Sequence, residues 1–242
     1  ARVTLLARDE AALRRTLNEL PPPAGGKGGT AGEGGAGGHD FIRADFRDPE
    51  AVRETVAAHL KSTGAYQILL NNAGGPPGGP VLGADPEEFR AAFASHLICN
   101  HLLVRLLVPG MKESGYGRII NIVSTSIKQP IRDLGVSNTI RGAVASWAKT
   151  LSAELAPDGI TVNNVLPGST ETDRIRSLIQ AKARSSGRRE EEVERAMKAE
   201  IPMGRFARPE EIAAAAGFLA TPAAGYITGV SLPVDGGRTS SL

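Results

Sequence analysis

Four residues with polar side chains or turn-forming backbones each follow a short apolar run of the sequence. They are Asp45, Asn72, Ser124 and Pro167. If the apolar runs are parallel strands, these residues lie at the carboxyl ends of the strands, where ligands bind in open parallel sheets. A carboxylate, an amide and a hydroxyl at such an edge can exchange hydrogen bonds with a polar ligand. The pattern therefore predicts a ligand site at one edge of a sheet.

Other chemistry finds little support in the residue types. His96 and His101 are five positions apart, or about 140° around a helix, so they cannot share a metal ion as an i, i+4 pair could. No CxxC or HExxH motif occurs, and no metal site is predicted. The single cysteine, Cys99, lies in an apolar stretch and is interpreted as a buried, inert thiol. It can form no internal disulfide, which indicates a reducing compartment.

Composition narrows the classes of partner. Hydrophobic residues make up 41% of the 242 residues and charged residues 22%, which is ordinary for one soluble domain. A net charge of +2 and an aromatic content of 4% give no reason to expect binding to nucleic acid or to an anionic membrane. There is no run of about 18 apolar residues and no signal-peptide layout at Ala1, so we expect a cytoplasmic protein.

Strand-like and helix-like patterns alternate along the chain. Strands are expected at 3–7, 41–46, 67–70, 118–123, 161–166 and 230–234, and helices at 9–20, 49–60, 86–111, 136–155 and 209–219. Strands separated by helices imply a parallel sheet that is covered on both faces. The prediction is an α/β fold, a Rossmann-like doubly wound parallel sheet in a single domain over 1–242.

Residues 21–39 are dense in proline and glycine, and 32–37 match GxGxxG. A phosphate-binding loop needs a strand before it and a helix after it, so that the helix amides face the phosphate. Here the expected order is a helix before and a strand after. The segment is therefore interpreted as a flexible surface loop rather than a cofactor loop.

Four motifs follow one another in a recognisable order. They are NNAG at 71–74, GRIINIVS at 117–124, GITVN at 159–163 with Pro167-Gly168 and Thr172, and YITG at 226–229 with VDGG at 234–237. In this order they resemble the short-chain dehydrogenase/reductase family of nucleotide-binding oxidoreductases, over the whole chain. The resemblance implies a carbonyl or alcohol oxidoreductase that acts on a small molecule with a nicotinamide cofactor.

The resemblance also assigns cofactor contacts. Asp45 and Phe46 would border the adenine, Asn72, Ala73 and Gly74 the adenosine ribose, and Pro167, Gly168, Thr170 and Thr172 the nicotinamide amide. The alternative is that these are only turn residues of a parallel sheet.

Arg8 bears on which cofactor is used. Members that prefer NAD usually carry an acidic residue where this sequence has Ala7, and the following Arg8 could instead face a 2′-phosphate. NADP(H) is therefore favoured over NAD(H). The alternative is a solvated arginine at the start of a helix.

The catalytic positions depart from the family. Its set of Asn, Ser, Tyr and a Lys four residues after the Tyr falls here on His96, Ser124, Ser137 and Arg141, so only the serine is kept. An aliphatic hydroxyl is a far weaker acid than a phenol. Arg141 is a planar, permanently charged fork that suits ribose binding better than proton relay. His96 could supply a proton or simply be a packed helix residue. The sequence resembles a divergent branch like the 3-oxoacyl-[acyl-carrier-protein] reductases, with Ser-Asn-x-x-Arg.

A second departure is at the start of the sequence. The family opens with a strand, a TGxxxGxG loop and a helix, whereas this sequence opens at what would be the second strand. We interpret the sequence as truncated, with the first βα unit absent, because the lost strand would be central to the sheet. A complete chain without that unit would bind a dinucleotide poorly.

The predicted reaction is the NADP(H)-dependent reduction of a ketone such as a 3-oxoacyl thioester. Ser124 would polarise the carbonyl, Arg141 would anchor the ribose, and His96 or a water relayed through Ser137 would supply the proton. The alternative is a catalytically impaired protein that keeps the fold for nucleotide binding or assembly.

Two segments bear on substrate and assembly. Residues 172–204, charged in both signs, match the family's substrate lid, or are only a solvated helical pair. A basic lid would suit an anionic substrate such as a phosphopantetheine-linked acyl chain. The apolar faces of 97–108 and 142–155 predict a homodimer or homotetramer, unless both are simply buried against the sheet.

Overall fold

The computed structural model describes residues 1–23 and 38–241, and within them six strands are all paired in parallel. They are β1 (Thr4–Ala7), β2 (Asp40–Arg43), β3 (Ile68–Asn71), β4 (Gly117–Ile122), β5 (Ile160–Pro167) and β6 (Ser231–Val234). β1 pairs with β2, and a four-stranded sheet runs in the order β3-β4-β5-β6. The predicted GxGxxG-like loop segment, 32–37, lies outside the described residues.

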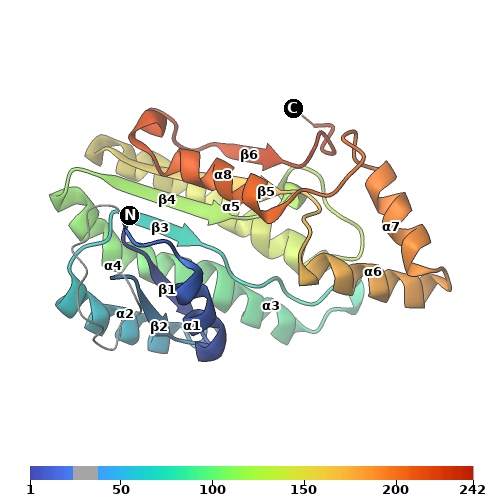
Figure 1. Ribbon diagram of the computed structural model, residues 1–242, viewed down its shortest axis with the longest axis horizontal. Coiled ribbons are helices and arrows are strands. Elements are labelled where there is room, and N and C mark those ends of the chain that lie inside the picture. The colour runs from blue at the N-terminus through green and yellow to red at the C-terminus, as the bar shows by residue number, and fades with distance from the viewer. Residues whose placement is uncertain (24–37, 242) are drawn as a thin grey trace.

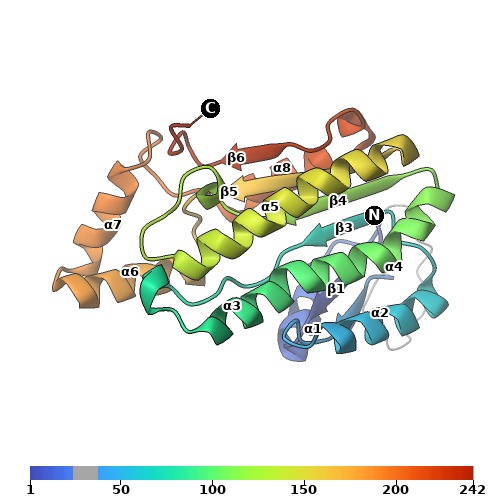
Figure 2. The same cartoon turned by 180° about the vertical axis from the view of Figure 1, so that it is seen from behind.

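Helices cover both faces of the strands, as predicted. They are α1 (Glu10–Glu19), α2 (Pro49–Thr63), α3 (Pro86–Phe93), α4 (Cys99–Glu113), α5 (Gly135–Leu155), α6 (Asp173–Ser186), α7 (Glu190–Ala199) and α8 (Pro209–Leu219). Figure 2 shows α4 and α5 lying across one face, and Figure 1 shows α8 on the opposite face. The Rossmann-like doubly wound fold is therefore confirmed.

One hydrophobic core joins the two groups of strands. It contains Ile42 of β2, Val52 of α2, Leu103 of α4, Ile119 of β4 and Val162 of β5. The last four side chains in this series are at most 3% exposed. Because a single core runs from β2 to β5, the described residues form one domain.

The sheet is divided between β1 and β3. Among the described residues no ladder joins these two strands. Ile68 and Leu70 of β3 are 41% and 49% exposed, whereas Leu69 between them is buried against α4. A side-chain hydrogen bond between Thr4 Oγ1 and Tyr66 Oη, 2.7 Å long, links the two groups instead.

The apolar helix predicted over 86–111 is interrupted. A π-helical turn, Ala94–Ile98, separates α3 from α4 and contains the buried His96. Such turns insert one extra residue into a helix and often mark functional sites. The whole segment, Pro86–Glu113, is long and apolar enough to cross a bilayer. It is identified as a core helix because Cys99, Leu103 and Leu107 pack against the strands.

The polar segment 172–204 forms the helical pair α6 and α7. These helices have a small core of their own, made by Ile175, Ile179, Val193, Ile201 and Phe206. Figure 1 shows the pair at the end of the molecule toward which β3, β4 and β5 point. The pair therefore lies at the carboxyl edge of the sheet, where ligands are expected to bind.

The central strand β4 should dominate stability. Replacing the fully buried Ile119 by alanine is expected to lower the free energy of unfolding by about 2–5 kcal/mol, because transfer and cavity costs add. Leu82, which is 97% exposed, is the control, and Leu82→Ala should change it by less than about 0.5 kcal/mol. Denaturant titration would measure both, and equal losses would contradict the placement of the core.

Candidate active site

Ser124 follows β4 and caps the short 3₁₀ helix Thr125–Ile127. Its Oγ accepts a hydrogen bond from the backbone N of Ser126 at 3.1 Å. Its backbone is extended, with φ −176°, and its side chain is only partly buried. One lone pair is thus used by the protein, while the hydroxyl hydrogen can still be donated to a ligand.

Ser137 and Arg141 lie one turn apart on α5. The Arg141 Nε donates to Ser137 Oγ at 3.2 Å, and its Nη1 donates to the carbonyl oxygen of Ile122 at 3.3 Å and to that of Val123. These carbonyls end β4 directly before Ser124. Arg141 therefore ties Ser137 to the end of the strand that presents Ser124.

The environment of Arg141 is unusual for a guanidinium. Burial, and to a smaller extent the positive charge of Arg174 on α6, lower its pKa to about 10. Arg141 nevertheless stays protonated near pH 7, because even this pKa is well above neutrality. Carbonyl dipoles at the end of β4 compensate its charge, and no carboxylate of the described residues forms an ion pair with it.

His96 joins the same cluster from the π-helical turn. Burial and the positive charge of Arg141 lower the pKa of His96 to about 4, and a hydrogen bond with the Gly74 backbone opposes them only in part. The imidazole is therefore neutral near pH 7. A neutral imidazole is a poor proton donor, so the prediction that His96 supplies the proton gains no support from its surroundings.

A row of asparagines beneath this cluster was not predicted as part of the site. Asn71, Asn121 and Asn164 occupy neighbouring positions on β3, β4 and β5, and their side-chain amides are hydrogen-bonded to one another. All three are at most 5% exposed. The available signal was an asparagine inside each of three otherwise apolar runs, where a buried amide requires a partner.

The predicted cofactor residues lie at the carboxyl ends of their strands. Asn72, Ala73 and Gly74 follow β3, and a Cβ built on Gly74 would meet nothing within 4 Å. Pro167 ends β5, and Thr170 Oγ1 donates to the carbonyl of Gly168 at 3.1 Å. Position 168 must be a glycine, because a Cβ added there would lie only 2.7 Å from Asp235 Cβ. Thr172 is the N-cap residue of α6.

The ends of β1 and β2 carry charges of both signs. The carboxylate of Asp45 binds Arg47 at 2.5 Å, which lowers the pKa of Asp45 to about 2, with a smaller contribution from Arg8. Arg8 is exposed. Phe46 is partly buried against the main core, so only part of its ring is free to border a ligand.

The predicted cofactor residues fit the nicotinamide and adenosine ends of a dinucleotide better than the pyrophosphate between them. At the start of each of α1 and α2 one backbone amide is already capped by an aspartate of the chain, Asp9 or Asp48, and that carboxylate would repel a phosphate. The open backbone at Gly74 and the exposed guanidinium of Arg8 suit a ribose and a phosphomonoester. The described residues therefore fit the nicotinamide and adenosine portions of such a cofactor.

Cys99 behaves as predicted for an inert thiol. It is fully buried, its Sγ donates to the carbonyl of Phe46 at 3.3 Å, and burial raises its pKa to about 11. The thiolate is therefore scarce near pH 7. Among the residues that the structure describes, no group of His, Cys, Asp and Glu could hold a metal ion.

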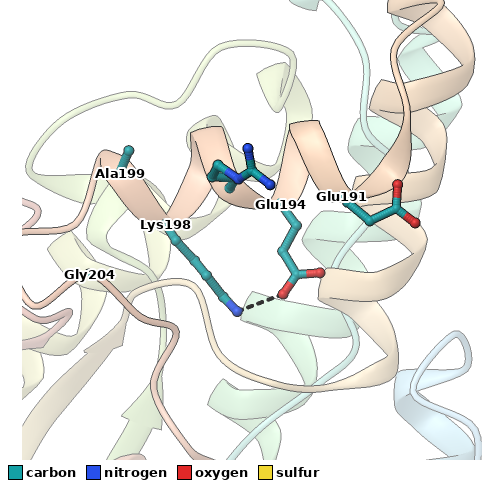
Figure 3. Close-up of a pocket in the computed structure, with 6 residues that line it drawn as sticks. Glu191, Glu194, Lys198, Ala199 and Gly204 are labelled. Carbon is teal, nitrogen blue, oxygen red and sulfur yellow. Dashed lines mark ion pairs between the residues drawn. The ribbon is translucent and has the colours of Figure 1, made fainter.

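A surface hollow lies on α7, away from the predicted catalytic residues. It measures about 540 Å³ and is lined by Glu191, Glu194, Arg195, Lys198, Ala199 and Gly204. Figure 3 shows the ion pair between Lys198 and Glu194, which is 2.6 Å long. Opposite charges on this hollow compensate one another, and none of the predicted catalytic residues lines it.

Comparisons with known proteins agree with this geometry. The family model described as enoyl-(acyl carrier protein) reductase matches residues 28–239. The 3-oxoacyl-[acyl-carrier-protein] reductase FabG of Vibrio cholerae is 33% identical over 192 residues, which are 78% of this chain and 73% of the relative.

Two solved structures are similar over the whole described chain. A variant of actinorhodin polyketide ketoreductase with NADPH has a TM-score of 0.85 and 31% identity, covering 99% of this chain and 88% of its own. The L-sorbose reductase of Gluconobacter frateurii, complexed with NADPH and L-sorbose, has a TM-score of 0.85 and 28% identity, covering 100% and 88%.

The chain belongs to the short-chain dehydrogenase/reductase family, as the sequence motifs predicted. It is an oxidoreductase of this family that uses a nicotinamide cofactor and a small-molecule substrate. The family, the fold and the class of enzyme are thus confirmed. The roles of Ser124, Ser137, Arg141 and His96 stay predictions.

The neutral state of His96 has a consequence for stability. Its pKa is about 4 when folded and about 6.5 when unfolded, so between these values the unfolded chain binds a proton that the folded chain does not. The free energy of unfolding should therefore fall as the pH falls through this window. His96→Asn should lose less stability between about pH 7.5 and about pH 5 than the unchanged chain. Denaturant titrations at both pH values would measure this. An equal loss of unfolding free energy in His96→Asn and in the unchanged chain would contradict a neutral His96.

Proposed function

We propose that this enzyme reduces the ketone of a 3-oxoacyl thioester or a similar carbonyl compound, with NADPH as the preferred cofactor. The observation that carries the proposal is that Arg141 bonds both to Ser137 and to the carbonyl of Val123, the residue before Ser124, at the carboxyl end of β4. Similarity to a 3-oxoacyl-[acyl-carrier-protein] reductase and to a polyketide ketoreductase supports this class of substrate.

The chemistry needs a hydride, a proton and a polarised carbonyl. When bound, the reduced nicotinamide supplies the hydride to the carbonyl carbon. Ser124 donates a hydrogen bond to the carbonyl oxygen and so favours the negative charge that develops there. That oxygen must then gain a proton to give the alcohol.

Ser137 is better placed than His96 to pass on that proton. Its Oγ accepts the Arg141 Nε–H, so its own hydrogen is free to be donated toward a ligand. The adjacent guanidinium favours the deprotonated form of the hydroxyl, as an opposite charge does for any acid. A water that reprotonates Ser137 would complete the transfer. His96, with its pKa near 4, would hold a proton only in acid solution.

Arg141 would also contact the cofactor. A Cβ built on Gly75 would lie 3.5 Å from Arg141 Nη2, so this part of the guanidinium reaches the loop after β3, where the ribose is expected. The Nη2 hydrogens take no part in the bonds to Ser137, Ile122 and Val123. They can therefore be donated to ribose hydroxyls.

We assign a lid function to 172–204. Arg174 on α6 donates to the carbonyl of Pro76 at 3.1 Å, which ties the helical pair to the loop after β3. Arg174 is close enough to Arg141 to lower its pKa. One guanidinium on the lid, Arg174, and one beneath it, Arg141, favour a substrate with anionic groups, such as a phosphopantetheine-linked acyl chain.

Assembly and location complete the proposal. Helices α4 and α5 present partly exposed apolar side chains beside their buried faces, including Leu106 and Trp147. We propose that these helices make contacts in a homodimer or homotetramer.

We further propose a reducing, cytoplasmic location, because Cys99 is a free thiol.

Ser124→Ala should separate chemistry from binding. Turnover of a 3-oxoacyl thioester with NADPH is expected to fall by about 100-fold or more, because a donor to the developing oxyanion is lost. The NADPH dissociation constant, measured by fluorescence titration, should stay the same. Ser146→Ala, an exposed serine on α5, is the control. Undiminished turnover in Ser124→Ala would rule out the assigned role.

Arg8→Ala should change cofactor preference. Loss of a charge-assisted contact to the 2′-phosphate is expected to weaken NADPH binding by about tenfold and to leave NADH binding unchanged. Arg15→Ala, an exposed arginine on α1, should affect neither cofactor. Equal losses for both cofactors in Arg8→Ala would show that Arg8 does not read the 2′-phosphate.

One observation favours a second candidate. Arg141 is held by two backbone carbonyls, so it lacks the freedom of the lysine that the family uses. This suits a nucleotide-binding protein without catalysis. Tight NADPH binding with no turnover across a panel of 3-oxoacyl thioesters and simple ketones would favour this alternative.

A further inference from the structure

The asparagine row runs in one direction across the sheet. Asn71 Nδ2 donates to Asn121 Oδ1 at 2.8 Å, and Asn121 Nδ2 donates to Asn164 Oδ1 at 3.0 Å. Asn164 Nδ2 then donates to Ser231 Oγ on β6 at 3.1 Å. Each amide oxygen except the first accepts from its neighbour. The first, Asn71 Oδ1, is buried and accepts no hydrogen bond from any described residue.

A buried acceptor without a partner is costly, at roughly 1–3 kcal/mol. Reversing all three amides would leave the nitrogen of Asn71 in the same place, so a polar atom faces this point for either polarity of the row. The row itself therefore calls for one more hydrogen-bonding group beside Asn71.

A small cavity lies at this end of the row. It measures about 10 Å³ and is lined by Asn71, Ala73, His96, Asn100, Asn121, Ile122, Val123, Arg141 and Val144. One water molecule needs about 10–15 Å³ and two to four polar partners. Five of the nine lining residues have polar side chains, so the cavity is both large enough and polar enough for a single water.

The lining groups complement one another as partners of a water. Asn71 Oδ1 can only accept a hydrogen bond, and the Nη2 of Arg141 can only donate one. The imidazole of His96 is neutral near pH 7 and so retains a nitrogen that can accept. A water could accept from Arg141 and donate to Asn71 and to His96. A cation would not suit the same space, because the guanidinium repels it.

We propose that this cavity binds one water molecule, and that Asn71, acting through the water, positions the guanidinium of Arg141. Arg141 is fixed on one side by Ser137 and the carbonyls of β4, and the water fixes its other side. Asn71 is thus a positioning residue. The consequence for cofactor binding rests on the proposed function, but the water and its link to Arg141 do not.

The first test needs no cofactor. Asn71→Leu removes the acceptor at nearly constant volume, and Asn164→Leu removes an equally buried asparagine from the far part of the same row. A crystal structure at high resolution should show the water in the unchanged chain and in Asn164→Leu but not in Asn71→Leu. A dry cavity in the unchanged chain, or a water that persists in Asn71→Leu, would overturn the proposal.

The second test asks whether Asn71 and Arg141 are coupled. No direct hydrogen bond joins these side chains among the described residues, so independent effects on the melting temperature should add. We expect Asn71→Leu with Arg141→Met to lose at least about 3 °C less than the sum of the single variants. Asn164→Leu with Arg141→Met should be additive. Additivity in both pairs would overturn the positioning role.

NADPH binding provides the link to function. Asn71→Leu should raise the NADPH dissociation constant by about tenfold, whereas Asn164→Leu should leave it unchanged. Equal changes in the two variants would mean that Asn71 matters only for stability. If the unchanged chain does not bind NADPH, the proposed function fails, while the crystal structure and the melting temperatures still decide the fate of the water.

Discussion

The guanidinium of Arg141 joins the two elements that carry the candidate site, and the other site residues depend on where it lies. It bonds to Ser137 on its own helix and to the last carbonyls of β4, directly before Ser124. Desolvation of this cation is unfavourable, as its lowered pKa shows. The carbonyl oxygens at the end of β4 offset this cost by accepting hydrogen bonds from Arg141. They are in reach because the strand ends beneath α5.

A fixed cation also determines which of its neighbours can move protons. Burial and this cation together lower the pKa of His96 and keep it neutral, and the cation occupies one lone pair of Ser137 while leaving the hydroxyl hydrogen free. A lysine would offer three rotatable donors on a flexible stem, whereas arginine offers a rigid fork. If Ser137 and Arg141 act as proposed, the site has an aliphatic hydroxyl, a weaker acid than a phenol, beside a cation that is anchored more firmly than a lysine ammonium.

The sequence predicted the strands and most helices because local patterns control them. A short continuous apolar run marked β4, helical spacing of apolar residues marked α5, and Asp48-Pro49 marked the start of α2. The π-helical turn at His96 was missed because one extra residue does not break an apolar pattern. The contacts of Asn71 were missed because amides 50 residues apart meet only once β3 and β4 are in register.

At the carboxyl ends of β1 and β2, where the adenosine end of the cofactor is expected, charges are also compensated mainly by groups of the chain itself. The helices that begin after β1 and β2 each place an aspartate, Asp9 or Asp48, on one of their first amides, so a negative charge of the chain already lies at each positive helix end. The positive charge available to an anionic ligand then comes from side chains, namely Arg8, Arg141 and Arg174. Arg141 is already bound on one face. In the described part of the chain, recognition of an anionic ligand would therefore depend on arginine side chains, and neighbouring polar groups must hold these in place. The asparagine row that ends at Asn71 is proposed to do this for Arg141.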